Sequence, residues 1–166
     1  MASKKKTKKA ASKPAPRKTK KAAGRPAKKR APAAASVLTL NDVAPGITAN
    51  DLETSLVWYR DVVGFAVEER WEKDGKLAGV SLRAGKATFM LGQDDWMKGR
   101  DRKKGEGFRL YCTTTQDIDA LAKKIEGRGG KLDQQPTDQP WGMRDIAMTD
   151  PDGFKITIAK NLKKKR

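Results

Sequence analysis

Histidine is absent from this chain of 166 residues, and cysteine occurs once, at Cys112. A lone cysteine cannot form an intramolecular disulfide, so nothing in the sequence requires an oxidising compartment. No apolar run approaches the roughly 20 residues that a membrane-spanning helix needs. The N-terminus carries cations without a following apolar stretch, which excludes a secretory signal. We therefore expect a cytoplasmic protein, with association with the nucleoid as an alternative.

Acidic residues are missing from residues 1–35, which contain 14 Lys or Arg. Four more basic residues form the C-terminal end, whereas residues 36–162 carry 19 basic and 20 acidic side chains. The formal charge of +17 therefore belongs to the ends of the chain. The nearly neutral central part is long enough for a hydrophobic core. We expect a basic tail over 1–35, a folded domain over 36–162 and a basic end over 163–166.

The tail also lacks apolar side chains larger than alanine between residues 2 and 35. Nothing there offsets the entropy lost on ordering, so the composition predicts disorder. Its dense positive charge favours binding to DNA or another polyanion, while a merely solubilising extension is the alternative.

One stretch of the tail, "KKAAGRPAKKR", resembles an incomplete AT-hook, in which a Gly-Arg-Pro core lies in the minor groove of A·T-rich DNA. Ala23 stands where the arginine before the glycine is expected. The resemblance implies that one arginine enters the groove and that the flanking cations contact phosphates. The candidate nucleic-acid-binding residues are Arg25, Lys20, Lys21, Lys28, Lys29 and Arg30.

The central part of the sequence repeats after 66 residues. Asp51-Leu52-Glu53 and Asp117-Ile118-Asp119 each open an apparent amphipathic helix, and three extended segments follow each helix. The second set of extended segments begins with "GGKLDQQ", residues 129–135. The sequence therefore predicts an α+β fold of two βαβββ modules, over about 36–92 and 107–160.

Three segments carry a family resemblance: "NDLETSLVWYRDVVGFAVEERW", "RLYCTTTQDIDALAKKIEGRGG" and "QPWGMRDIAMTDPDGFKITI". Together they resemble the glyoxalase/bleomycin-resistance/dioxygenase superfamily, also called the vicinal oxygen chelate (VOC) superfamily. The resemblance covers about residues 36–160. It implies two βαβββ modules that form a cupped mixed sheet, often completed by dimerisation, so we expect a homodimer.

The resemblance also implies a divalent metal held by histidines and glutamates of both modules. This chain has no imidazole, and Thr157 stands where the last-strand carboxylate is expected, four residues after the glycine of "DPDG". The corresponding stretch of the first module, residues 88–90, has no ionisable group, and Asp145 alone does not make a metal site. We expect no metal and no cofactor, and we favour the absence of catalysis.

Other catalytic groups are also scarce. Cys112 lacks a histidine that could activate it and is interpreted as a small packed residue. The carboxylate pairs Glu68-Glu69 and Asp94-Asp95 are interpreted as solvated. The sequence therefore gives no catalytic residue.

The "QPWG" stretch is similar to that of bleomycin-resistance-type proteins, which sequester drugs without modifying them. The resemblance implies that Trp141 stacks on a planar ligand; the alternative is that it packs beneath its own turn. Leu77 falls where a second stacking aromatic would stand. Trp58 and Tyr59 are expected to pack. The candidate cavity-lining residues are Trp141, Phe89, Tyr111, Arg109, Trp71, Trp96 and Leu77.

The central loop "KGRDRKKG" is strongly basic, which would favour an anionic or neutral ligand if it borders the cavity; a solvated connection is the alternative. The leading hypothesis is a metal-free, drug- or metabolite-sequestering protein, with a role in antibiotic resistance. A DNA-associated protein that uses its folded domain for dimerisation is the first alternative. A divergent glyoxalase- or dioxygenase-like enzyme is the second.

Overall fold

The computed structural model describes Leu38 and residues 41–162. Contacts divide the chain into Met1–Thr39 and Leu40–Arg166, and all the helices and strands given below belong to the second unit. The six candidate nucleic-acid-binding residues lie outside the described residues. No helix in the described ranges has the length and apolar character needed to span a bilayer.

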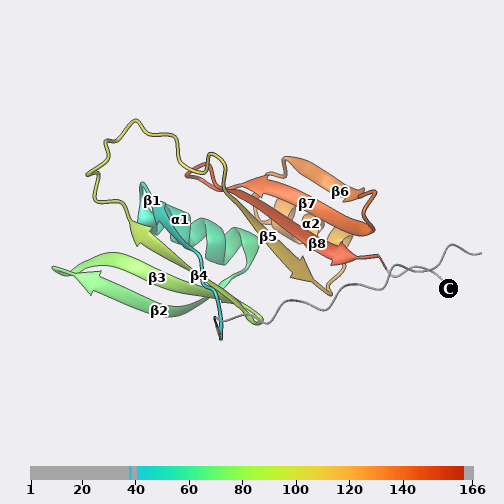
Figure 1. The fold of residues 1–166 in the computed structure, drawn as a ribbon, viewed down its shortest axis with the longest axis horizontal. Helices are drawn as coiled ribbons and strands as arrows, with labels where there is room; N and C mark the ends of the chain where they lie inside the picture. Colours follow the sequence, from blue (N-terminus) through green and yellow to red (C-terminus); the bar gives the residue numbers. More distant parts are fainter. Residues whose placement is uncertain (1–37, 39–40, 163–166) are drawn as a thin grey trace, which may run out of the picture. The chain divides into compact units, whose positions relative to one another are not determined.

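The first module is one helix against a four-stranded sheet of order β1-β4-β3-β2 (Figure 1). β1 is parallel to β4, and the other pairs are antiparallel. The helix begins as α-helix and continues without a break as the π-helix η1. The elements are β1 (Gly46–Ala49), α1 (Leu52–Val57), η1 (Trp58–Val63), β2 (Ala66–Lys73), β3 (Lys76–Ala84) and β4 (Ala87–Gln93).

The second module repeats this arrangement with the order β5-β8-β7-β6 and a parallel β5–β8 pair. Its elements are β5 (Arg109–Thr114), α2 (Ile118–Gly127), β6 (Gln134–Asp138), β7 (Met143–Thr149) and β8 (Lys155–Asn161). The predicted α+β fold of two βαβββ modules is therefore confirmed. Each helix lies against one face of its own sheet (Figure 1).

Local sequence signals set the helix ends. Asp51 and Asp117 cap the two helices. The side chain of each accepts a hydrogen bond from the backbone N–H of the residue three positions later, at 3.1 Å for Asp51 and 2.8 Å for Asp117. Gly64, with φ of 103°, ends η1 in the left-handed region that glycine adopts without strain. Both modules contribute to one hydrophobic core, in which the predicted stripe of Leu52, Leu56 and Tyr59 is almost fully buried.

The "DPDG" turn between β7 and β8 joins the second module to the first helix. The Tyr59 hydroxyl donates to Asp150 Oδ2 at 2.7 Å, in a buried position. Asp152 accepts from the Asn50 N–H and the Ser55 hydroxyl, both at 2.6 Å. The "DPDG" turn is therefore tied to the first helix and to Asn50 ahead of it, and these bonds hold the two modules together.

Candidate functional site

The open face of the first sheet, meaning the face opposite its helix, carries a slot of about 420 Å³. Three glycines, Gly46, Gly79 and Gly92, leave its floor without side chains. The ring of Trp71 lies on Gly79, where an added Cβ would come within 2.9 Å of the ring atom Cε3. Trp71 and Met90 are 38% and 39% exposed. The slot is therefore apolar, with an indole and a thioether as its accessible groups.

The open face of the second sheet is polar. The Arg109 guanidinium donates to Thr157 Oγ1 at 2.7 Å, and Tyr111 beside it is half exposed. Asp145 is buried, and its Oδ1 accepts from the side-chain amides of Gln134 and Gln139 at 2.6 and 2.8 Å. These bonds engage Oδ1 of the buried Asp145 carboxylate within the protein.

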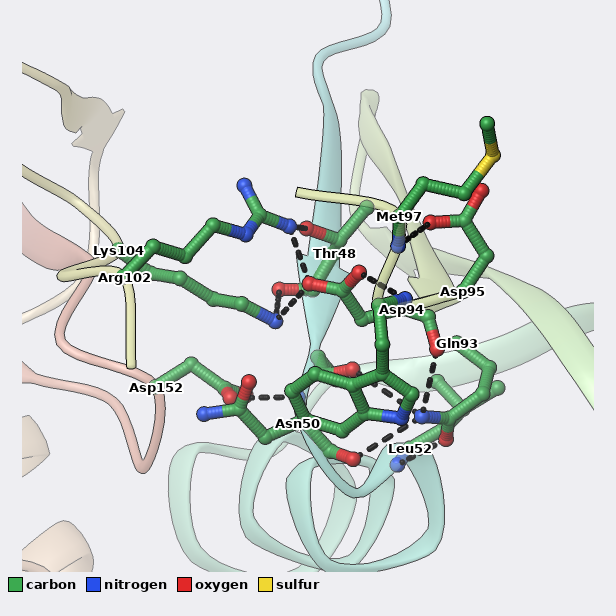
Figure 2. Close-up of polar contacts among 12 residues, drawn as sticks. Thr48, Asn50, Leu52, Gln93, Asp94, Asp95, Met97, Arg102, Lys104 and Asp152 are labelled. Carbon is green, nitrogen blue, oxygen red and sulfur yellow. Dashed lines mark hydrogen bonds and ion pairs between the residues drawn. The ribbon is translucent and has the colours of Figure 1, made fainter. Parts of the chain in front are cut away.

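The basic loop between the modules is anchored to the first sheet. Asp94, at the end of β4, is 4% exposed and accepts from Lys104 Nζ at 2.7 Å and from Arg102 Nη2. The same two cations reach β1: Lys104 donates to the Thr48 carbonyl at 3.1 Å, and Arg102 to the Thr48 hydroxyl at 3.3 Å (Figure 2). The hydrogen bond from Lys104, and then that from the Trp96 N–H, hold the pKa of Asp94 well below its usual range.

This anchoring corrects the alternative that the loop is only a solvated connection. The Lys104 side chain is 2% exposed. Next to it, Gly105 has φ of 74° and lies so close to the "DPDG" turn that an added Cβ would meet the Gly153 carbonyl at 2.2 Å. Trp96 also belongs to this loop, with Arg100 stacked over its ring at 4.5 Å.

Two further hollows flank the loop. One, of about 320 Å³, is lined by β1 residues Gly46–Thr48, by Phe108 and Phe154, and by the loop residues 102–106. The other, of about 450 Å³, is lined by residues 104–109 with Gly153 and Lys155. The predicted residue Arg109 therefore borders a hollow as well as the open face of the second sheet.

The predicted lining residues do not share one cavity, and Trp96 lines none of the three hollows. Trp71 lines the slot, and Tyr111 and Arg109 lie on the second open face. Trp141 is 65% exposed in the turn between β6 and β7, which contradicts the alternative that it packs beneath that turn. Its ring lines none of the three hollows described above.

Phe89 and Leu77 do not fulfil their predicted roles. Phe89 is 4% exposed, and its ring centroid lies 4.9 Å from that of Tyr59 and 5.0 Å from that of Phe65. It faces the helix because strand side chains alternate, and its neighbour Met90 takes the open face instead. Leu77 is half buried against the core. Tyr59 and Trp58 pack, as the sequence predicts.

The groups considered for catalysis are engaged or inert. Burial raises the pKa of the Cys112 thiol, which disfavours the thiolate. Glu68 pairs with Arg83 and accepts from the Ser81 hydroxyl, and Asp94 is held by its two cations. Neither carboxylate pair is therefore arranged as an acid and a base.

The sequence does not single out three residues that the structure places at this site: Met90, Arg102 and Lys104. In the sequence, Met90 is considered only within the stretch 88–90, although strand alternation against the buried Phe89 places its side chain on the open face. Arg102 and Lys104 are considered only as part of the basic loop. No sequence signal pairs them with Asp94, which lies 8 and 10 positions earlier, because loop geometry decides that contact.

Residues 39–158 match the family model of the Glyoxalase/Bleomycin resistance protein/Dioxygenase superfamily. The match covers most of the chain, and the chain belongs to this superfamily.

Individual relatives are more distant. A probable lactoylglutathione lyase of Synechocystis is 29% identical over 126 residues, covering 72% of this chain and 94% of the relative. A solved superfamily member from Sphaerobacter thermophilus is 26% identical, with a TM-score of 0.57 over 72% of this chain and 98% of that one. TioX from Micromonospora sp. ML1 is 18% identical, with a TM-score of 0.59 over 73% and 100%. The TioX likeness shows the fold alone.

The divalent metal that the superfamily implies does not fit these residues. Met90 pairs with Gly46 on β1, and Thr157 occupies the same place in the second module, paired with Tyr111 on β5. A thioether, a neutral hydroxyl and a phenol are poor donors for a Lewis-acid divalent ion, which takes imidazoles and carboxylates. Within the described ranges, no three His, Cys, Asp or Glu side chains gather as a metal site.

Proposed function

We propose that the folded domain binds a small planar organic molecule in the slot of the first sheet, without a metal and without reacting with it. One observation carries the proposal: the glycine-floored slot presents the accessible Trp71 and Met90 side chains. A flat indole and a polarizable thioether suit an apolar planar ligand, because both offer large contact area at little geometric cost.

The absence of catalysis is part of this proposal. The Synechocystis relative carries a lyase name, yet Met90 and Thr157 stand where carboxylate ligands are expected in related enzymes. The described residues supply no activated thiol and no carboxylate pair in their place. Sequestration of a drug or metabolite needs only affinity, which the slot can supply.

We propose that two copies associate, because the chain belongs to a superfamily whose domains commonly dimerise. The Trp141 side chain, 65% exposed in the β6–β7 turn, is a candidate contact in that dimer. Trp141 remains a candidate ligand contact in that dimer. Its contribution separates two versions of the proposal: a ligand held by Trp71 in the slot, or one held by Trp141 at the β6–β7 turn.

The test uses full-length protein and N-phenyl-1-naphthylamine, a neutral planar probe whose fluorescence rises on entering an apolar site. In the presence of EDTA we expect saturable binding that Trp71→Ala weakens by about 30-fold, the effect of removing a central aromatic anchor. Trp141→Ala separates the two versions of the proposal: binding in the slot predicts a change in the dissociation constant of less than threefold, whereas binding at the β6–β7 turn predicts a loss as large as that expected for Trp71→Ala. A probe that never binds, or that binds only after metal is added, contradicts the proposal.

A second function is proposed for the basic tail, because residues 1–35 carry 14 cations and no acid. The tail binds duplex DNA through phosphates, and the association constant falls with salt. With about six phosphates engaged, the log–log slope is near −5. A chain lacking residues 1–35 should lose that salt dependence. Unchanged affinity and slope would contradict DNA binding by the tail.

A further inference from the structure

The slot on the first sheet lies next to a cationic hollow. The 420 Å³ slot and the 320 Å³ hollow share the β1 wall formed by Gly46, Ile47 and Thr48. Two cations of the loop also donate hydrogen bonds to Thr48. Arg102 donates to the Thr48 hydroxyl, and Lys104 donates to the Thr48 carbonyl. The cations of the loop therefore contact the wall of the apolar slot directly.

The hollow keeps a positive charge after its internal pairs are counted. Three cations surround it, Arg102, Lys103 and Lys104, against the carboxylates of Asp94 and Glu106. The Lys103–Glu106 pair is long, at 3.9 Å, and both side chains are at least 73% exposed. Such a pair is screened by water and leaves Lys103 available to a ligand.

Arg102 is well placed to hold an anion. All the hydrogen bonds that it forms within the described ranges use one nitrogen, Nη2, and its side chain is 33% exposed. The other guanidinium donors remain for an oxyanion, which arginine can bind through two parallel bonds. Asp94 and Thr48 fix the group beforehand, so little side-chain entropy is lost when a ligand binds.

Resting on the proposed function, we propose that the ligand is an organic acid with a planar apolar body. The body lies in the slot against Trp71 and Met90, and the acid group lies in the adjoining hollow, bound by Arg102 and Lys103. Lys104 acts as a positioning residue, since its buried ammonium pairs with Asp94 and holds the loop on β1. Carboxylate, sulfonate and phosphate share the chemistry that this hollow recognises.

The experiment compares two probes that differ by one acid group, the neutral N-phenyl-1-naphthylamine and its sulfonate, 8-anilino-1-naphthalenesulfonate. Full-length protein is titrated at physiological salt by fluorescence. We expect the sulfonate to bind about tenfold more tightly, the usual scale of one charge-assisted hydrogen-bonded contact. Arg102→Gln and, more weakly, Lys103→Gln should remove this preference and leave the affinity of the neutral probe unchanged.

Lys86→Gln is the control, because Lys86 is exposed in the β3–β4 turn and lines none of these hollows. It removes the same charge and should leave the preference intact. Because the basic tail is the same in every variant, loss of the preference in Arg102→Gln distinguishes the hollow from attraction by the tail. If Arg102→Gln and Lys103→Gln leave the preference unchanged, the inference is wrong. If neither probe binds, the proposed function is wrong. If both probes bind with equal affinity and Trp71→Ala weakens both, the proposed function is supported and the inferred preference for an acid is wrong. Circular dichroism identifies any variant that does not fold.

Discussion

The two modules share a backbone plan and differ in what their open faces present. In the first module, glycines 46, 79 and 92 with Trp71 and Met90 form an apolar slot. In the second, Tyr111 takes the place of Gly46 and Thr157 that of Met90, while Asp145, one position before the buried Ile146, takes that of Gly79. One face is hollow and apolar, and the other is filled and polar.

The difference follows from side-chain volume on equivalent strands. Glycine on a strand leaves the backbone open to close approach, and Trp71 uses one such place by lying on Gly79. In the second module, the equivalent positions carry side chains. Thr157 accepts a hydrogen bond from Arg109 on β5, and Asp145 accepts one from Gln134 on β6. A repeated fold can therefore keep its core and assign binding to one copy only.

The largest effect is expected on the free energy of unfolding, when the basic loop loses its ion pairs with Asp94. Asp94→Asn leaves the buried Lys104 ammonium without its counter-charge, and breaking such a pair is strongly destabilising. Because the pKa of Asp94 is lowered in the folded protein, its stabilisation is present above the ordinary value of 3.8 and is lost as pH falls below it.

Urea unfolding at pH 7 should show a clearly lower midpoint for Asp94→Asn than for the parent protein. Between pH 4 and pH 2 the variant should lose less further stability than the parent. Asp95→Asn is the control, because Asp95 is exposed and bonds only the Met97 N–H among the described residues. Equal midpoints for the two variants would contradict the role given to Asp94.

The next largest effect is expected for Gly79→Ala, which adds a side chain to the floor of the slot. The new methyl group would meet the Trp71 ring at 2.9 Å and the Leu91 carbonyl at 3.2 Å, so the ring must move. We expect about tenfold weaker binding of N-phenyl-1-naphthylamine, within the range for losing one aromatic contact. Tyr111→Ala, on the second face, should change that affinity by less than twofold; the reverse order would place the site on the second module.

The junction between the modules gives a smaller effect. Tyr59→Phe removes the hydroxyl that donates to Asp150, a carboxyl whose pKa burial already raises. The free energy of unfolding should fall by about 1–2 kcal/mol, because one acceptor of a buried carboxyl loses its donor. Tyr111→Phe, at a half-exposed site, should have no measurable effect in the same urea titration.

The smallest expected effect concerns the second face. Thr157→Val keeps the side-chain shape and removes the hydroxyl that accepts from Arg109. Arg109 is exposed and can bond to water instead, so the loss should be about 0.5 kcal/mol or less, with unchanged probe affinity. A large loss of affinity would show that the polar face takes part in binding.

Repetition and periodicity predict most of this fold, since the helices, their caps and the buried stripe all depend on local sequence. The strand expected over 129–135 forms instead at Gln134–Asp138, because Gly129 and Gly130 serve to end α2 through bonds to Glu126 and Ile125. The site was harder to predict. Trp71 was found as a lining residue, whereas Phe89 was placed on the wrong face of β4, and the Asp94 clamp depends on loop geometry.

The most direct test of the account is an NMR titration of ¹⁵N-labelled full-length protein with N-phenyl-1-naphthylamine in EDTA. We expect the largest chemical-shift changes at the amides of Gly79 and Gly92 and at the Trp71 indole, with the Thr157 and Tyr111 amides nearly unchanged. Shifts centred on the second sheet, or shifts that need added divalent metal, would contradict it.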